Sequence, residues 1–407
     1  MDMIHDEVDF WDQPYYWLTK TVLRASGYWP YQSPRERIIC RAILQFLYWI
    51  QIIPEIAVVI RHFDDADLVM ETLSSFLIDV VVMANVCTFV VHGDKISQIR
   101  NLLEQIKQNW RIFPKNNGLS LLHQHSESGK IRSIVYAAYL GAAWVVFVSE
   151  PVHFRLIRLV IPSNKTLVLR FAIPVDYGPL DVEKYYYTIL LVGAISILAI
   201  VILVIAADVL LFLYSHHACG LLAAVGFAIE NLPVADASEK KTRDHEYQYM
   251  KKCVILHSRS IQFSDTVEEI FRWNIFMTIG INMIVISMTA FQVVTNFNTL
   301  PRLVKTLVFA VGSILHLFIQ CYMSEQIINH SLGIGHSLMN AKWYCATSET
   351  KQLMQFMLMR SHVPCQLTAG SMLLISLDTF SSNFCELLHG IHGYAVNREE
   401  FGKESYR

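Results

Sequence analysis

The stretch Tyr185–Ile229 reads YYYTILLVGAISILAIVILVIAADVLLFLYSHHACGLLAAVGFAI, and Asp208 is its only charged residue. A helix of this length without proline is about 67 Å long at about 1.5 Å per residue. That is about twice the hydrocarbon core of a bilayer, which is about 30 Å thick. We therefore predict that residues 185–207 cross a membrane and that the second half projects into the cytosol. Since an apolar helix needs cover there, we expect it to pack on Lys251–Phe271 and Ser331–Arg360.

The rest of the composition agrees with a membrane protein. Of the 407 residues, 53% are hydrophobic and only 17% are charged, whereas soluble domains carry about 25% charged residues. The mean hydropathy is +0.36. The net charge of -2 and the lack of a basic stripe argue against nucleic acid as a partner. The first twelve residues are acidic, unlike a signal peptide, so the first apolar run, which begins near Ile38, is expected to act as an uncleaved signal-anchor.

Seven stretches are long and apolar enough to cross a bilayer, which predicts an all-α membrane protein with seven transmembrane helices. They are residues 39–60, 68–91, 132–150, 185–207, 273–294, 304–324 and 365–388. The organisation expected from them is a cytosolic N-terminal segment (1–38), a seven-helix domain (39–388) and a polar extracellular tail (389–407). If the last stretch only dips into the membrane, the count is six.

The direction of the chain follows from two signals. The segments on the side of the N-terminus hold more Lys and Arg, but they are also longer, so this bias has little weight. Asn164-Lys165-Thr166 is an N-glycosylation sequon in the loop 151–184. Glycosylation of Asn164 requires that this loop lies outside, and the N-terminus is then cytosolic.

Signatures of enzymes and metal sites are absent from the sequence. Gly333-Ile334-Gly335 lacks the third glycine of a dinucleotide-binding loop, and His245-Glu246 has no second histidine at the zincin spacing. His123 and His125 are better explained as a solvated pair than as metal ligands. The eight cysteines are scattered without a CxxC pair, so neither zinc nor disulfides are expected. We predict a protein that is not an enzyme and needs no cofactor.

Three acidic residues fall in or beside the apolar stretches. Asp79 lies near the middle of the second stretch, where a lone aspartate costs on the order of 3 kcal/mol. We expect it to face the bundle interior, either as a structural hydrogen bond or as part of a ligand cavity. Glu71 and Asp208 lie nearer the ends of their stretches, and we expect water at the membrane interface to solvate both.

Several local patterns, taken in order, resemble those of the insect odorant receptor family. They are GYWP at Gly27–Pro30, HACGL at His217–Leu221, YMSEQ at Tyr322–Gln326 followed by Trp343-Tyr344, and SLDTF at Ser376–Phe380. The resemblance extends over essentially the whole chain. One departure is the polar and charged end, Asn397–Arg407, because the family usually continues apolar and aromatic to a short end.

The resemblance implies a subunit of a ligand-gated cation channel in the membrane of an olfactory neuron dendrite. Family members have a cytosolic N-terminus and form hetero-tetramers with a shared odorant co-receptor. The seventh helices of the subunits line the pore of the tetramer. The co-receptor carries a long insertion between the fourth and fifth spans, and this chain has a loop of ordinary length there. The expected role is therefore that of an odour-tuning subunit, with a small volatile odorant, the co-receptor and lipid as its partners.

We predict an odorant pocket between the outer halves of spans two to six. Aromatic residues gather there, although an interfacial belt or plain helix packing explains them equally well. The residues expected to contact the ligand are Leu73, Phe76, Leu77, Gly141, Trp144, Tyr187, Leu191, Phe291, Phe309 and Ser313.

The seventh stretch has a polar face that suggests ion conduction. If 365–388 is one helix, Met372, Ser376, Thr379, Asn383 and Glu386 lie along one side of it. We predict that Ser376, Thr379, Asn383 and Glu386 line a pore between subunits, with hydroxyls and amides replacing part of the hydration of a cation. The alternative is that these groups hydrogen-bond to neighbouring helices.

Other seven-helix chemoreceptors fit less well. A G-protein-coupled receptor would carry a DRY-like triplet after the third span and NPxxY in the seventh, and neither is present. A gustatory receptor of the same superfamily would show a Thr-Tyr…Gln-Phe pattern in its last span, which is also missing. A transporter would show related halves or paired broken helices, and none stands out.

Overall fold

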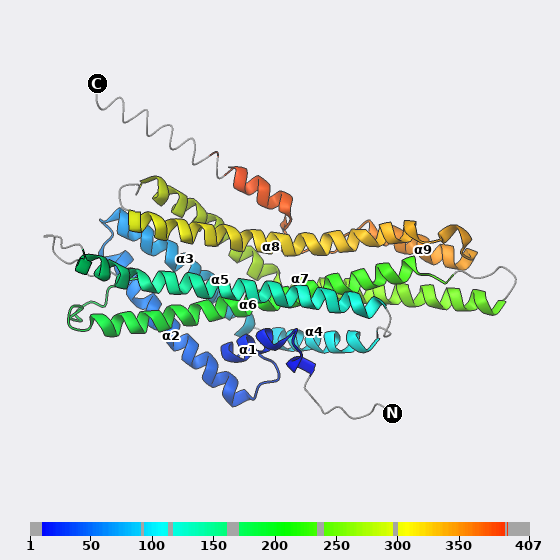
Figure 1. Cartoon of the computed structure of the whole chain (residues 1–407), viewed down its shortest axis with the longest axis horizontal. Coiled ribbons are helices and arrows are strands. Elements are labelled where there is room, and N and C mark those ends of the chain that lie inside the picture. The colour runs from blue at the N-terminus through cyan, green and yellow to red at the C-terminus, as the bar shows by residue number, and fades with distance from the viewer. Residues whose placement is uncertain are drawn as a thin grey trace, which may run out of the picture.

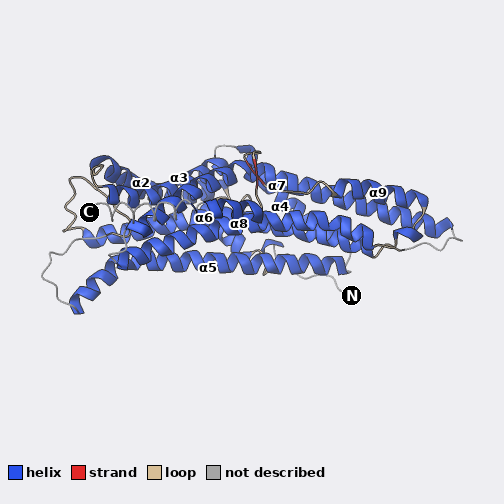
Figure 2. Ribbon diagram, turned by 90° about the horizontal axis from the view of Figure 1, so that it is seen from above, coloured by secondary structure: helices blue, strands red, loops and turns tan. Residues whose placement is uncertain are grey.

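The computed structural model describes residues 10–90, 93–112, 117–160, 171–233, 240–295, 300–386 and 389. Nearly all of these residues are helical, and the long helices run along one axis in an elongated bundle (Figures 1 and 2). The elements are η1 (Phe10–Asp12), α1 (Trp17–Ser26), α2 (Pro34–Arg61), α3 (Ala66–Val90), α4 (Gly93–Ile112), α5 (Asn117–Val160), α6 (Tyr186–Glu230), α7 (Lys240–Thr295), α8 (Leu300–Asn340), η2 (Trp343–Cys345), α9 (Ser348–Ser361), β1 (Thr368–Ala369) and β2 (Leu373–Leu374).

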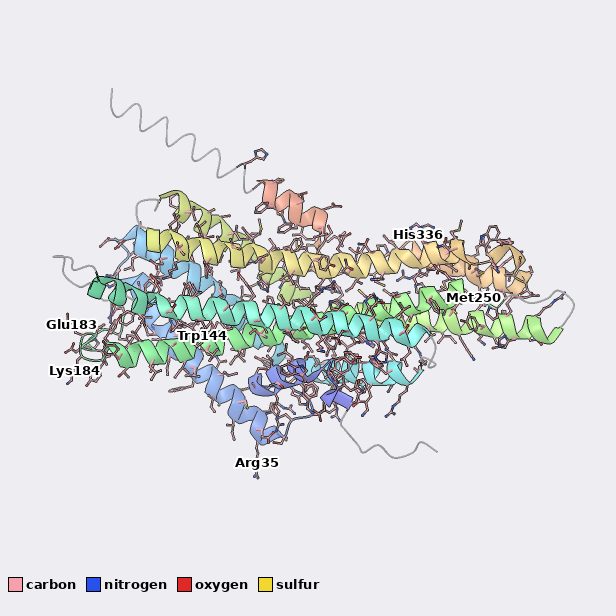
Figure 3. The ribbon with its side chains drawn as sticks, viewed as in Figure 1. Arg35, Trp144, Glu183, Lys184, Met250 and His336 are labelled. Carbon is pink, nitrogen blue, oxygen red and sulfur yellow. The ribbon has the colours of Figure 1, made fainter. Side chains whose placement is uncertain are left out.

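The stretch Tyr185–Ile229 forms the single helix α6, as predicted. It contacts α5, α7 and α8, and every residue from Tyr214 to Leu222 is buried. Glu183 lies at one end of the bundle, which we call the Glu183 end, and Met250 lies toward the other, which we call the Met250 end (Figure 3). Because α6 is apolar on all sides, other helices or lipid must cover each of its faces.

The expected cover for the second half of α6 is confirmed. Near the Met250 end, side chains of α6 form one apolar cluster with side chains of α7, α8 and α9. Its buried members include Leu222, Val225 and Ile229 on α6, Met250 and Cys253 on α7, Ile334 and Leu338 on α8, and Met354 and Met357 on α9. The regions 251–271 and 331–360 therefore contribute to this cluster, and the helices α7 and α8 extend far beyond a bilayer thickness to reach it.

Six helices of the described residues are long and apolar enough to cross a membrane. They contain the first six predicted spans, within α2, α3, α5, α6, α7 and α8. The all-helical prediction is therefore confirmed for these six.

The start of the seventh predicted span is wrong. Residues 365–388 are not one helix, because β1 and β2 pair as a small antiparallel hairpin within this range. Gly370 and Ser371 at its turn both have φ of 62°, a left-handed conformation that a helix cannot contain. The helix begins only after this turn, at 377, and runs over 377–386. We call this segment the terminal helix; the tail predicted at 389–407 lies outside the described residues apart from residue 389.

The GYWP motif has a structural explanation. Gly27 ends α1 with φ of 72°, and its N–H donates to the carbonyl of Arg24. A Cβ at this position would lie 2.8 Å from the carbonyl oxygen of Arg37 on α2, so only glycine allows the two helices to approach. Tyr28 and Trp29 follow and are buried. The motif fastens the N-terminal segment onto the bundle.

Candidate functional site

A cavity of about 600 Å³ lies in the bundle and is lined by residues of α3, α5, α6, α7 and α8. Small-molecule sites in proteins commonly measure about 300–1,000 Å³ and are mostly apolar with a few polar groups. The wall of this cavity is of that kind, since Val, Ile, Leu and aromatic side chains provide most of it. The helix α6 contributes residues from Ile197 to Phe212, the half that was predicted to lie in the membrane and the turn after it.

Aromatic side chains form one wall of the cavity, mainly from α5. Tyr139, Trp144 and Phe147 line it, and Phe309 joins them from α8. The rings of Phe147 and Phe309 are 6.2 Å apart. Trp144 crosses toward α6, where its Nε1–H donates to the carbonyl of Ala194 at 3.1 Å (Figure 3). This hydrogen bond fixes the orientation of the indole at the cavity wall.

A group of three polar side chains lines the cavity at the contact of α5, α6 and α8. Asp208 is only 6% exposed; it accepts a hydrogen bond from the hydroxyl of Tyr136 and lies 3.1 Å from Nε2 of His316. The prediction that Asp208 is solvated at the membrane interface is therefore wrong. The predicted span ends at 207, but α6 and the helices that cover it continue past this residue.

Arg132 on α5 lies beside this group and is also held in place. Its guanidinium contacts Nε2 of His216 at 3.0 Å and donates to the hydroxyl of Tyr322 at 3.2 Å. The same guanidinium lies over the ring of Tyr322, 5.1 Å from its centroid. Arg132 is thus fully engaged with α6 and α8, and it closes the cavity on this side.

Lys305 on α8 connects several segments near the Glu183 end. Its Nζ lies 2.8 Å from Glu71 on α3 and 3.2 Å from Glu150 on α5. It also donates to the carbonyl of Ala172 at 2.6 Å and lies over the ring of Phe147. Glu71 therefore has a protein partner in addition to the predicted solvent, since its side chain is 33% exposed.

Asp79 lies at the cavity wall, as one of its two predicted roles requires. It is 3% exposed and lines the cavity together with Asn85 from the same helix. The hydroxyl of Tyr48 donates to its backbone carbonyl at 2.8 Å. The carboxyl group of Glu55 hydrogen-bonds to its side chain, and no other group of the described structure donates to Oδ2.

Three of the ten residues predicted to contact a ligand line the cavity: Trp144, Phe309 and Ser313. The other seven, Leu73, Phe76, Leu77, Gly141, Tyr187, Leu191 and Phe291, are not part of its wall. Tyr187 and Leu191 are 71% and 62% exposed on the outside of the bundle. Phe76 packs against the core instead. A Cβ added to Gly141 would meet no atom within 4 Å.

Sequence reasoning missed several cavity residues. Asp208, His316 and Asn85 are polar residues of its wall, and the sequence carried a signal for Asp208. A single charge within the apolar stretch Tyr185–Ile229 is by itself a sign of a functional or paired group.

The residues of the predicted pore face have separate roles. Met372 lies in the hairpin and is 78% exposed, so it does not share a helix face with the others. Ser376 caps the terminal helix, with its Oγ accepting from the backbone N–H of Thr379 at 3.1 Å. The hydroxyl of Thr379 donates to the carbonyl of Leu374. Asn383 is half-buried and Glu386 is exposed, one turn and two turns further along.

The terminal helix is attached to α8 in two ways. The backbone N–H of Leu377 donates to Glu325 at 3.2 Å. The ring of Phe380 packs edge-on against that of Phe318, with centroids 5.5 Å apart. The helix that carries the predicted pore residues therefore rests on the helix that carries Phe309, Ser313 and His316.

Metal chemistry has no basis in the described part of the chain, where no group of three His, Cys, Asp or Glu side chains converges. All eight cysteines are free thiols. The predicted glycosylation site, Asn164, lies outside the described residues.

Comparisons with known proteins agree on one family. A family model described as 7tm odorant receptor matches residues 65–384. Odorant receptor 9a of Drosophila melanogaster is 21% identical over 326 residues, which cover 79% of this chain and 80% of that protein. Odorant receptor Or1 of Anopheles gambiae is 22% identical, covering 62% of this chain and 66% of its own length.

A solved structure shares the fold. The insect olfactory receptor OR5 from Machilis hrabei, solved in complex with eugenol, superimposes with a TM-score of 0.72. The sequences are 14% identical over 93% of this chain and 97% of that one. The resemblance found in the sequence is thereby confirmed, and so is the prediction that this chain is not an enzyme.

Proposed function

Because this chain belongs to the 7tm odorant receptor family, a family of multi-pass membrane proteins that detect odorants, we propose that it is the odorant-binding subunit of a heteromeric ligand-gated cation channel. In this proposal it assembles with an odorant co-receptor subunit in the dendrite membrane of an olfactory neuron. Its N-terminus lies in the cytosol and the loop 151–184 lies outside.

The observation that carries the proposal is the mostly apolar cavity of about 600 Å³. Trp144 and Phe309 provide flat apolar contact area, and Ser313 provides a polar atom at the same wall. A ligand of about ten non-hydrogen atoms at about 0.8 kcal/mol each binds with roughly -8 kcal/mol, which is micromolar affinity. Volatile molecules of this size fit both the volume and the chemistry of the wall.

The channel part of the proposal rests on the terminal helix. Thr379, Asn383 and Glu386 share one face of it by their spacing of four and three. A polar face in a membrane must meet protein or water, and stripes from several subunits together would surround a hydrated path. Since the terminal helix packs on α8 through Phe380, and α8 also lines the cavity, one helix contacts both the ligand site and the pore segment.

The test is to record currents from cells that express this chain with and without an insect odorant co-receptor while a panel of volatile alcohols, esters, ketones and amines is applied. The proposal expects odour-evoked cation currents only when both proteins are present. Currents of equal size from the co-receptor alone, or no current at normal surface expression of both subunits, would contradict it.

A further inference from the structure

Two buried carboxyl groups meet at the contact of α2 and α3, beside the cavity. Glu55 is completely buried and Asp79 is 3% exposed, and their side chains interact with each other. Glu55 Oε1 accepts a hydrogen bond from the amide of Gln51 at 2.7 Å. Of the two acids, only Asp79 lines the cavity. Glu55 contacts Asp79 but is not part of the cavity wall.

The two carboxyl groups hydrogen-bond to each other, and no other group of the described structure donates to Oε2 of Glu55 or Oδ2 of Asp79. In the part of the chain that the structure describes, no lysine, arginine or histidine forms an ion pair with either residue. A hydrogen bond between two carboxyl groups requires that they share a proton, and a cation in the cavity would stabilise the ionised form of Asp79 in its place. This wall is therefore suited to a positively charged occupant.

Asn85 provides a second and independent sign of such an occupant. It lies further along α3 and also lines the cavity. Its side chain is 9% exposed, and its Oδ1 has no hydrogen-bond partner. The acidic side chain of Asp79 and the unsatisfied acceptor Asn85 Oδ1 therefore belong to the same cavity wall.

The cations near the cavity are already engaged elsewhere. Arg132 is held by His216 and Tyr322, and Lys305 is held by Glu71 and Glu150. Neither is available to neutralise Asp79. The opposite wall offers aromatic rings, which attract cations as well as apolar groups.

We propose that the cavity binds small apolar molecules that carry a protonated amine, with Asp79 as the counter-ion, Glu55 as the hydrogen-bonded acid that positions Asp79, and Asn85 as a second hydrogen-bond acceptor. This inference rests on the proposed function and specifies the ligand class of the same site. The ammonium group meets α3, and the carbon skeleton lies against Trp144 and Phe309. Alcohols of the same skeleton can donate one hydrogen bond to the wall but bring no charge.

The experiment compares amines with alcohols on matched skeletons: hexylamine with 1-hexanol, octylamine with 1-octanol, and 2-phenylethylamine with 2-phenylethanol. Currents are recorded from cells that express this chain with an odorant co-receptor. The amine of each responding pair should be at least about tenfold more potent than the alcohol, which corresponds to about 1.4 kcal/mol. Asp79→Asn and Glu55→Gln keep the size of each side chain and should abolish this preference, because the amine loses its counter-ion and should weaken at least about tenfold, whereas the uncharged alcohol should weaken much less.

Two controls complete the design. Glu183→Gln removes one negative charge at an exposed site on the Glu183 end and should leave both potencies unchanged. Asn85→Leu should weaken amines and alcohols alike, because Oδ1 accepts from either donor. Alcohols that act while amines do not, or equal shifts of both classes in Asp79→Asn, overturn the inference but leave the proposed function intact. Silence of the wild-type pair toward both classes and toward the wider panel, at normal surface expression, instead counts against the proposed function itself.

Discussion

The ammonium group of Lys305 on α8 lies 2.8 Å from the carboxylate of Glu71 on α3. The same ammonium reaches Glu150 on α5 and the carbonyl of Ala172 in the following segment. Three helices of the cavity are therefore joined by one cation near the Glu183 end. The side chain of Lys305 is 13% exposed, so solvent screens these contacts only in part.

Removing this cation should loosen the bundle. Lys305→Met keeps the length of the side chain but leaves Glu71 and Glu150 without their partner, which should cost about 1–3 kcal/mol of stability. A lower Tm of the purified protein in detergent is the measurement. Lys184→Met removes an exposed lysine and is the control. Equal Tm values for the two variants would show that the Lys305 contacts contribute nothing to stability.

Trp144 should determine odorant potency. Trp144→Ala removes an aromatic wall of the cavity and the hydrogen bond to Ala194, and we expect potency to fall about tenfold, or about 1.4 kcal/mol. Trp144→Phe should restore part of it, since a ring returns without the N–H donor. The concentration dependence of odour-evoked current measures both, with Trp49→Ala as a control on the exposed side of α2. Unchanged potency in cells with normal surface expression would assign Trp144 to packing alone.

The terminal helix should control permeation. Thr379→Leu and Asn383→Leu place bulky apolar groups on its polar face, and we expect altered cation permeability ratios or loss of current with little change in odorant potency. Reversal potentials in solutions of different cations test this. Ser381→Leu, on the opposite side of the helix, serves as the comparison. If all three variants conduct alike, the polar face is a packing surface.

Acid should destabilise the protein through histidines near the Met250-side half of α6. Burial lowers the pKa of His125 to about 4, with the charge of Arg132 and neighbouring His330 adding to the effect. Burial and Arg132 lower the pKa of His216 to about 3. Burial also lowers the pKa of His330.

These histidines take up a proton near pH 6.5 in the unfolded chain but only at lower pH in the folded chain. The stability that the protein has with these histidines neutral is therefore fully present above about pH 6.5. It is lost as the pH falls from there toward 4, by up to about 1.4 kcal/mol per pH unit and histidine. The Tm of the wild type should therefore fall as the pH is lowered from about 7.5 to about 5. The Tm of His216→Gln should fall less steeply over the same range. His336→Gln changes an exposed histidine and should follow the wild type; a flat Tm in the wild type would contradict the prediction.

The orientation of the chain gives a fifth test. Epitope tags at Met1 and Arg407 should stain on opposite sides of intact cells, with only the C-terminal tag accessible before permeabilisation. A sugar on Asn164 should be removable by a glycosidase and absent in Asn164→Gln. A C-terminal tag detected only after permeabilisation would place the C-terminus in the cytosol and contradict the predicted topology.

How far the sequence could predict the cavity depended on the kind of helix. In the membrane-spanning part of α5, small and aliphatic residues separate the aromatic ones. Trp144 could therefore be assigned to an inner face. In α6 every face is apolar, and no pattern distinguishes the lipid side from the protein side. Tyr187 and Leu191 were therefore placed in the pocket although they lie outside the bundle.

Two other differences have local causes. Asp208 follows directly after the predicted span, and nothing in the sequence shows that Tyr136 and His316 meet it from helices far away in the chain. The late start of the terminal helix depends on the φ angles of Gly370 and Ser371. Glycine suggests such a turn, but serine does not, because a positive φ is rare for it.

The continuity of α6 has a mechanical consequence. From Asp208 at the cavity to Glu230 near the apolar cluster, the helix runs without proline for about 33 Å at about 1.5 Å per residue. A rod of this length that tilts by about 5° at the cavity moves its far end by about 3 Å, which is close to the radius of a side chain. Such a displacement is large against the tolerance of a packed apolar cluster. If Leu222, Val225 and Ile229 are displaced, the parts of α7, α8 and α9 that pack on them must move as well. Under the proposed function, a small ligand that tilts α6 at the cavity would therefore also change the packing at the Met250 end.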